Sequence, residues 1–162
     1  MDPPAGLQTL AGTPFDIRGI IQLVSSHPHL AQHFPPAVNG IRVRQRCLGL
    51  NFLHATCFAG TNGETSAEYI IHYDNGLRHS IPVVYGQNIS DWWYLPSTPP
   101  ALNADTVVAW QGANPHSRRA GCGVQLYKFH WVNPHPEAVI ATIDLKSTKA
   151  GPAPFLIAIT AE

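Results

Sequence analysis

The chain has 162 residues, only 12% of them charged, and its ten Lys and Arg balance its ten Asp and Glu. This length suits one domain with a substantial core. A neutral surface argues against nucleic-acid or membrane-surface binding, since both usually need a basic face. No stretch approaches the ~20 apolar residues of a membrane-spanning helix, so we expect no membrane insertion.

Residues 1–14 are predicted to be a linker-like lead and residues 15–162 a single module. The N-terminus lacks the basic start and apolar run of a signal peptide. We therefore expect a part of a larger multidomain protein. The sequence does not fix its compartment, and an extracellular or periplasmic location of the parent protein is favoured.

Short alternating segments predict strands from the first third of the chain onward. Residues 15–24 alternate as a strand, and residues 25–39 form a Pro- and His-rich loop with a short helical turn over 30–33. Residues 40–47 place three arginines on one face, namely Arg42, Arg44 and Arg46. A solvated outer surface is the simplest explanation, and an anion or sugar-acid groove is the alternative. Residues 48–58 place His54 on one face with Leu48, Leu50, Phe52 and Phe58, which predicts a core histidine.

Residues 68–93 organise the rest of the chain, because they predict a β-hairpin followed by a loop rich in aromatic residues. Two β-branched and aromatic runs, 69–73 and 81–85, flank Asn75-Gly76, the signature of a tight type I′ turn. That turn would place His72 opposite His79. A three-residue loop with a bulge is the alternative and would shift the pairing by one residue.

Later strands are predicted over residues 106–112, 124–131, 139–146 and 155–160. The last is apolar on both faces, as a central strand would be. About nine strands without a convincing amphipathic helix predict an all-β sandwich or small barrel. In such folds function resides in loops at one end of a rigid scaffold.

The three cysteines, Cys47, Cys57 and Cys122, cannot all pair within the chain. Buried free thiols are expected at Cys47 and Cys57. A single Cys47–Cys57 or Cys57–Cys122 disulfide is the alternative. The absence of a C-x-x-C pair excludes a zinc ribbon.

Catalytic and metal motifs are weak. The sequence has no G-x-S-x-G elbow and no D-x-D-x-D-G calcium loop, and calcium held by backbone carbonyls is not readable from sequence. His72 and Asp74 form an H-x-D pair like the opening of a two-His-one-carboxylate iron site, with His116, His130 or His135 as a third ligand. Asp74 more simply completes the hairpin turn. The other histidine pair, His27 and His29 with nearby His33, lacks the glutamate of a cupin site. We therefore expect no cofactor.

The aromatic cluster is the strongest candidate site. Trp92, Trp93 and Tyr94 follow Asp91 directly, and Trp110 stands just before a loop that carries Asn114 and Arg118. Sugars offer C–H faces that stack on indole rings and hydroxyls that bind short polar groups. Successive side chains of an extended segment diverge, so one of Trp92 and Trp93 is expected to fill the core.

Several segments together resemble one recurrent bacterial accessory module: PFDIRGIIQL, LNFLHAT, the YIIHYDNG…IPVVYG hairpin, DWW, W-x-G-x-N, WVNPHP and PFLIAIT. The module is related to galactose-binding-like jelly rolls and to NPCBM-type carbohydrate-binding modules. The resemblance covers residues 15–160 and implies a jelly-roll β-sandwich with a non-catalytic role, most simply glycan recognition.

We therefore expect a non-catalytic carbohydrate-binding module whose ligand contacts Asp91, Trp92, Trp93, Trp110, Asn114 and Arg118. A protein-interaction or sensory domain that docks on its parent through the arginine face is the first alternative. A small β-fold metalloenzyme using His72 and Asp74 is the second.

Overall fold

The computed structural model describes residues 4–28 and 33–162. In these ranges the chain forms twelve strands and one short helix, α1 (Pro115–Arg119). The strands are β1 (Gly6–Leu10), β2 (Thr13–Ile17), β3 (Ile21–Gln22), β4 (Ala37–Gln45), β5 (Gly49–Cys57), β6 (Thr65–Tyr73), β7 (Arg78–Val84), β8 (Trp93–Tyr94), β9 (Thr106–Gly112), β10 (Gly123–Val132), β11 (Ile140–Ser147) and β12 (Ala153–Ala161). The prediction of a mostly β chain with little helix is confirmed, although the strands outnumber the expected nine or so.

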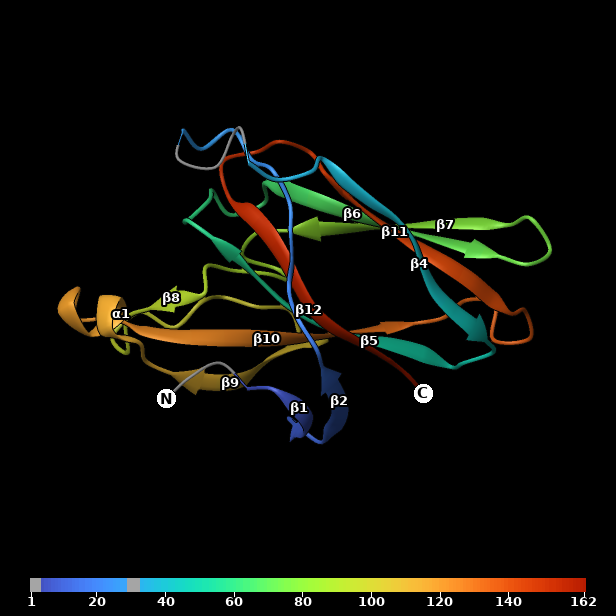
Figure 1. The fold of residues 1–162 in the computed structure, drawn as a ribbon, viewed down its shortest axis with the longest axis horizontal. Helices are drawn as coiled ribbons and strands as arrows, with labels where there is room; N and C mark the ends of the chain where they lie inside the picture. The colour runs from blue at the N-terminus through green and yellow to red at the C-terminus, as the bar shows by residue number, and fades with distance from the viewer. Residues whose placement is uncertain (1–3, 29–32) are drawn as a thin grey trace.

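Two antiparallel sheets pack against each other in a sandwich-like arrangement, and β1 and β2 form a separate hairpin (Figure 1). The larger sheet has the order β3-β12-β5-β10-β8, with β9 also paired to β10. The smaller sheet has the order β4-β11-β6-β7. Strand β12 thus lies between two neighbours, as its apolar sequence on both faces predicted.

The larger sheet is covered on both faces, which explains why β5 is buried along nearly all of its length. The main core lies between the sheets and contains Phe52, Tyr69 and Ile143. A second core on the opposite face of β5 contains Leu53 and Phe15 of β2. Successive strand residues point to opposite faces, so the neighbours Phe52 and Leu53 belong to different cores.

The N-terminal segments differ from the sequence prediction. The expected linker-like lead contains β1 and the start of β2. The strand expected over residues 15–24 is instead divided into β2 and β3. Leu48, expected in the core, is 71% exposed because β5 begins only at Gly49. The helical turn predicted over 30–33 falls mostly outside the described residues.

The β6–β7 hairpin forms where it was predicted, but its register is that of the three-residue loop. His72 lies opposite Arg78, whereas a two-residue turn would have placed it opposite His79. The Tyr73 amide donates to the Leu77 carbonyl, and the Gly76 amide donates to the Tyr73 carbonyl. Of the turn residues, Gly76 has a positive φ, +86°. A loop of residues 74–76 shifts the pairing by one residue.

The edge strand β4 carries Arg42 and Arg44, and Arg46 follows its last residue. All three arginines are exposed, as expected of a solvated face. Gly40 and Arg44 have positive φ where the pairing of β4 with β11 changes register. Bulges and charges on an edge strand hinder pairing with another chain.

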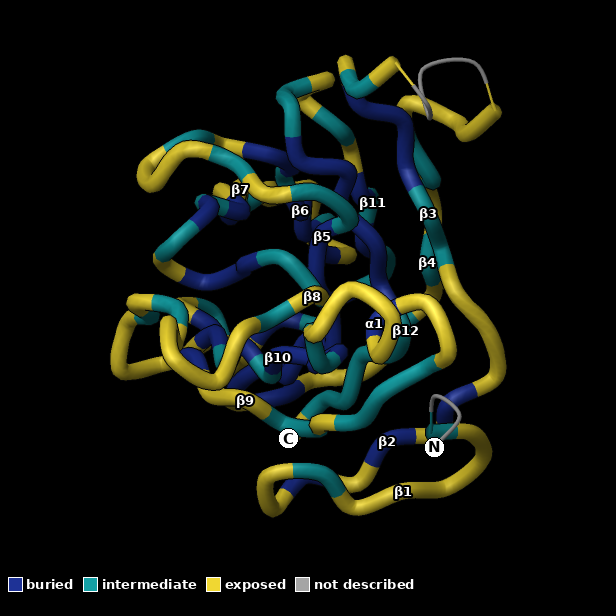
Figure 2. The backbone as a smooth tube through the Cα atoms, turned by 90° about the vertical axis from the view of Figure 1, so that its left-hand side faces the viewer, coloured by how far each residue is buried: buried dark blue, intermediate teal, exposed yellow. Residues whose placement is uncertain are grey.

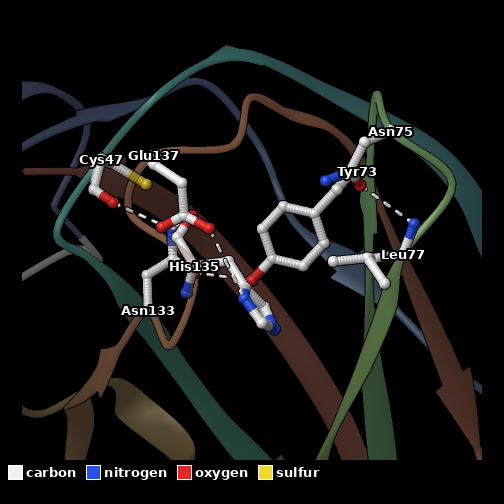
Figure 3. Close-up of polar contacts among 7 residues, drawn as sticks. All are labelled: Cys47, Tyr73, Asn75, Leu77, Asn133, His135 and Glu137. Atoms are coloured by element: carbon white, nitrogen blue, oxygen red, sulfur yellow. Dashed lines mark hydrogen bonds and ion pairs between the residues drawn. The ribbon is translucent and has the colours of Figure 1, made fainter.

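The turn after β10 is organised by the buried side chain of Asn133 (Figure 3). Its Oδ1 accepts from the Tyr73 hydroxyl (2.6 Å) and the His135 amide (3.0 Å), and its Nδ2 donates to the Cys47 carbonyl (2.9 Å). One amide thus joins β6 to the segments before β5 and after β10. Asn133 of the predicted rigid turn is therefore a structural residue.

All three cysteines are free thiols. The disulfide alternatives are therefore wrong. Cys47 is buried as predicted, whereas Cys57 is only partly buried. Among the described residues, no helix has the length and apolar character needed to cross a membrane.

The imidazole of His54 lies fully buried between the sheets, which confirms the predicted core histidine. Its Nε2 lies 2.8 Å from the Asn88 carbonyl, which only accepts, so Nε2 carries the proton. Its Nδ1 therefore accepts from the Tyr69 hydroxyl at 3.0 Å. Burial lowers the pKa of His54 to about 4. The imidazole joins β5 to β6 and to the loop after β7.

We predict that neutral His54 makes folding pH-dependent. An unfolded histidine titrates near pH 6.5 and the folded one near 4, so between these values the unfolded chain binds more protons and stability falls as the pH falls. The gap corresponds to a loss on the order of 3 kcal/mol. Urea unfolding at several pH values measures it. The stability difference between wild type and His54→Gln should shrink from pH 7 to pH 4, and a constant difference would contradict the assignment.

Candidate functional site

An open cleft of about 540 Å³ lies at the end of the sandwich that carries β8 and α1, the end facing the viewer in Figure 2. Aromatic and short polar side chains line it. They are Tyr85, Trp93, Tyr94 and Tyr127, with Asn62, Ser90, Asp91 and Gln125. The loop after β8 adds a rim that includes Leu95 and Pro100.

The loop between β7 and β8 is pinned to the scaffold on both sides of Asp91. The Asn88 side chain accepts from the Val84 amide (2.7 Å) and donates to the Pro82 carbonyl (2.9 Å). Next to Asp91, the Thr56 amide donates to the Ser90 carbonyl (3.0 Å) and the Trp92 amide donates to the Thr56 carbonyl (2.8 Å). The end of β5 therefore fixes the backbone that presents Asp91 and Trp93.

A local hydrogen bond joins Asp91 to Trp93. The Asp91 Oδ1 accepts a 3.1 Å hydrogen bond from the Trp93 amide, which turns the chain so that both side chains line the cleft. Burial raises the pKa of the Asp91 carboxyl to about 6, although the Trp92 and Trp93 amides favour its ionised form. Trp93 is 37% exposed, the most open of the four tryptophans.

The back wall of the cleft is a chain of hydrogen bonds. Gln111 donates to the Gln125 side chain (3.1 Å), Gln125 donates to the Tyr127 hydroxyl (2.6 Å), and that hydroxyl donates to the Asp91 carbonyl (2.8 Å). Burial raises the pKa of Tyr127 to about 12. The phenol therefore stays neutral and acts as a fixed polar group.

Two glycines make room for the cleft walls. The ring of Tyr94 lies directly over Gly123, where a Cβ would overlap it. The Asn62 amide lies against Gly86 in the same way. Sequence reasoning did not assign Asn62, Tyr85, Gln125 or Tyr127 to the site, because they come from β10 and from two loops that are distant in the sequence.

Trp92 and Trp110 do not face this cleft. They line a second cleft, of about 370 Å³, together with apolar side chains such as Ile17 and Phe155. Trp92 packs edge-on against Phe155, with ring centroids 6.2 Å apart. Trp92 and Trp93 thus diverge as expected, and the predicted set of sugar-binding tryptophans is divided between two faces of the larger sheet.

Asn114 and Arg118 also lie apart from the candidate site. Asn114 is the N-cap of α1, and its side chain accepts from the Ser117 amide (2.9 Å). Arg118 is an exposed residue of the same helix. Neither is among the described residues that line the two clefts, so Asn114 has a structural role.

His72 is paired with Asp144 and not with Asp74. Its Nε2 lies 2.8 Å from Asp144 Oδ2, while Asp144 Oδ1 accepts from the Gly40 amide (2.8 Å). Asp74 is exposed in the hairpin turn. Within residues 4–28 and 33–162, no three His, Cys, Asp or Glu side chains gather as a metal site would need. His29 of the H-x-H pair lies outside these residues.

In comparisons with known proteins, the chain matched no protein-family model and no curated protein.

We predict that Gly86→Ala costs about 2–3 kcal/mol of unfolding free energy, because φ is +74° there and the new Cβ would overlap Asn62. Gly63→Ala is the matched control. Its φ is +89° and no atom lies within 4 Å of the added Cβ. This variant should therefore lose only the unfolding free energy that a positive φ costs a residue with a Cβ, about 1 kcal/mol. Equal losses in urea unfolding would contradict the packing of Asn62 on Gly86.

Proposed function

We propose that the protein is a non-catalytic carbohydrate-binding module and that its glycan occupies the cleft beside Trp93. The exposure of Trp93 on the wall of this cleft supports the proposal most directly. An indole face stacks on the C–H face of a sugar ring. Asp91 and the exposed amide of Asn62 would bind the hydroxyls. The buried amide of Gln125 would hold the Tyr127 hydroxyl in the back wall. Tyr94 and the loop after β8 would form the second wall.

The finer fold assignment belongs to the same proposal. We infer a galactose-binding-like jelly roll, the fold that the sequence resemblance implies. Two packed antiparallel sheets with the candidate cleft at one end support it. An open cleft buries little of its ligand, so the affinity for a single glycan chain should be weak.

Trp93→Ala should lower glycan affinity at least tenfold, which corresponds to about 1.4 kcal/mol. Trp110→Ala is the matched control, because it removes the same side chain from the other cleft. Calorimetric titration with soluble polysaccharides measures both variants, and thermal unfolding confirms that each is folded. An unchanged affinity in Trp93→Ala, or an equal loss in Trp110→Ala, would exclude this cleft as the site.

A second candidate function rests on the outer face of the smaller sheet. The strand register aligns Arg42 of β4, Thr142 of β11, His72 of β6 and Arg78 of β7 in one row. Strands lie about 4.8 Å apart, so the two arginines are about 14 Å apart at their Cα atoms. Such a row fits an acidic segment of a parent protein, which is the docking role that the sequence left open.

Amide hydrogen exchange tests the docking role. If the face docks, exchange in β4 and β7 should be slower in the full parent protein than in this domain alone, and charge reversal at Arg42 and Arg78 should remove the difference. Identical exchange in the two proteins would count against docking. Slower exchange around β8 alone would point to a partner at the cleft.

A further inference from the structure

The cleft beside Trp93 carries one formal charge, and it is negative. Of the described residues that line it, only Asp91 is ionised near neutral pH, and none is a lysine, arginine or histidine. The other titratable groups there are the phenols of Tyr85, Tyr94 and Tyr127 and the thiol of Cys122. The cleft therefore offers nothing to neutralise an anionic ligand.

One oxygen of Asp91 is left for a ligand. Oδ1 is occupied by the Trp93 amide. Oδ2 accepts no hydrogen bond of 3.5 Å or less in the described part of the chain, although the Trp92 amide also lies close enough to favour the ionised carboxylate. Oδ2 is also not a fully buried atom without a partner, so it keeps some contact with solvent, and Asp91 and Trp93 line the same cleft.

The sign of this charge selects among sugars. Two charges a few ångströms apart interact more strongly near a protein surface than in bulk water. A uronic acid or a sulfated sugar would therefore be repelled by the Asp91 carboxylate. A sugar ammonium within reach of Oδ2 would gain a charge-assisted hydrogen bond, which is stronger than the bond a neutral hydroxyl makes.

We propose that the cleft prefers glycans that carry a free amino group, with Asp91 Oδ2 accepting from the ammonium while the same sugar stacks on Trp93. The inference rests on the proposed function, because it names the sugar class for that site. It makes Asp91 the residue that determines specificity. The partial burial of the carboxylate strengthens the preference, since a desolvated charge is less screened than an exposed one.

The test compares oligomers of glucosamine, of N-acetylglucosamine and of a uronic acid by calorimetric titration. The pH is set just above the pKa of Asp91, about 6, so that its carboxyl is ionised while the amino groups of the sugar remain protonated. For the wild-type chain we expect the glucosamine oligomer to bind at least tenfold more tightly than the acetylated one, and the uronic acid to bind least. Asp91→Asn keeps an oxygen for the Trp93 amide and should reduce the tenfold preference to about one. Asp74→Asn makes the same change in net charge in the exposed hairpin turn, and should leave the preference intact.

The outcomes separate this inference from the proposal beneath it. Equal affinity for the amino and acetylated oligomers, or tighter binding of the uronic acid, with Trp93 still required, would overturn the amino-sugar preference and keep the glycan site. Loss of the preference in Asp74→Asn as well would also overturn it, because the effect would then follow net charge. No binding of any oligomer would refute both.

Discussion

The hydrogen bond from His54 to the Asn88 carbonyl is the contact on which the candidate site depends. His54 lies on β5, at the centre of the larger sheet, and its other nitrogen accepts from Tyr69 of the smaller sheet. The imidazole therefore joins both sheets to the loop that leads into Asp91. Removing one member of such a buried hydrogen-bond chain lowers the stability of the fold. The donor or acceptor that remains has no water molecule to bond instead. The core and the cleft are thus parts of one network.

The two faces of the larger sheet carry different kinds of side chain, one polar and one apolar. On one side, Trp93 stands beside a carboxylate and several amides, an arrangement suited to a polyhydroxyl ligand. On the other side, Trp92 and Trp110 lie among aliphatic and aromatic residues and cover the second core. The turn closed by the hydrogen bond from the Trp93 amide to Asp91 places Trp92 on the opposite side from its two neighbours. A count of tryptophans in the sequence therefore overestimates the proposed glycan site, because Trp93 is the one tryptophan among the described residues that line the cleft.

Local patterns predicted the fold well and the site in part. The β6–β7 hairpin, the exposed arginines of β4 and the buried His54 follow from alternation, which depends on neighbouring residues. The hairpin register depends on which residues of the turn adopt a positive φ, and within residues 74–76 that residue is Gly76. Alternation along the two strands does not reveal this. The cleft required long-range packing: Asn62 meets Gly86, and Tyr94 meets Gly123, across separate elements. No spacing rule encodes such contacts. The sequence prediction therefore assigned Asn114, which caps a short helix, to the ligand and left out Asn62 of the cleft wall.

Nuclear magnetic resonance of the four indole N–H groups, recorded during titration with a glucosamine oligomer, tests whether the cleft beside Trp93 binds the sugar. The indoles lie in three settings: Trp93 on the polar cleft, Trp92 and Trp110 on the apolar one, and Trp131 in the main core. Binding at the polar cleft should shift the Trp93 signal with a saturable dependence on sugar concentration and leave the other three nearly unchanged. A saturable shift at Trp92 or Trp110, with Trp93 unmoved, would contradict the account.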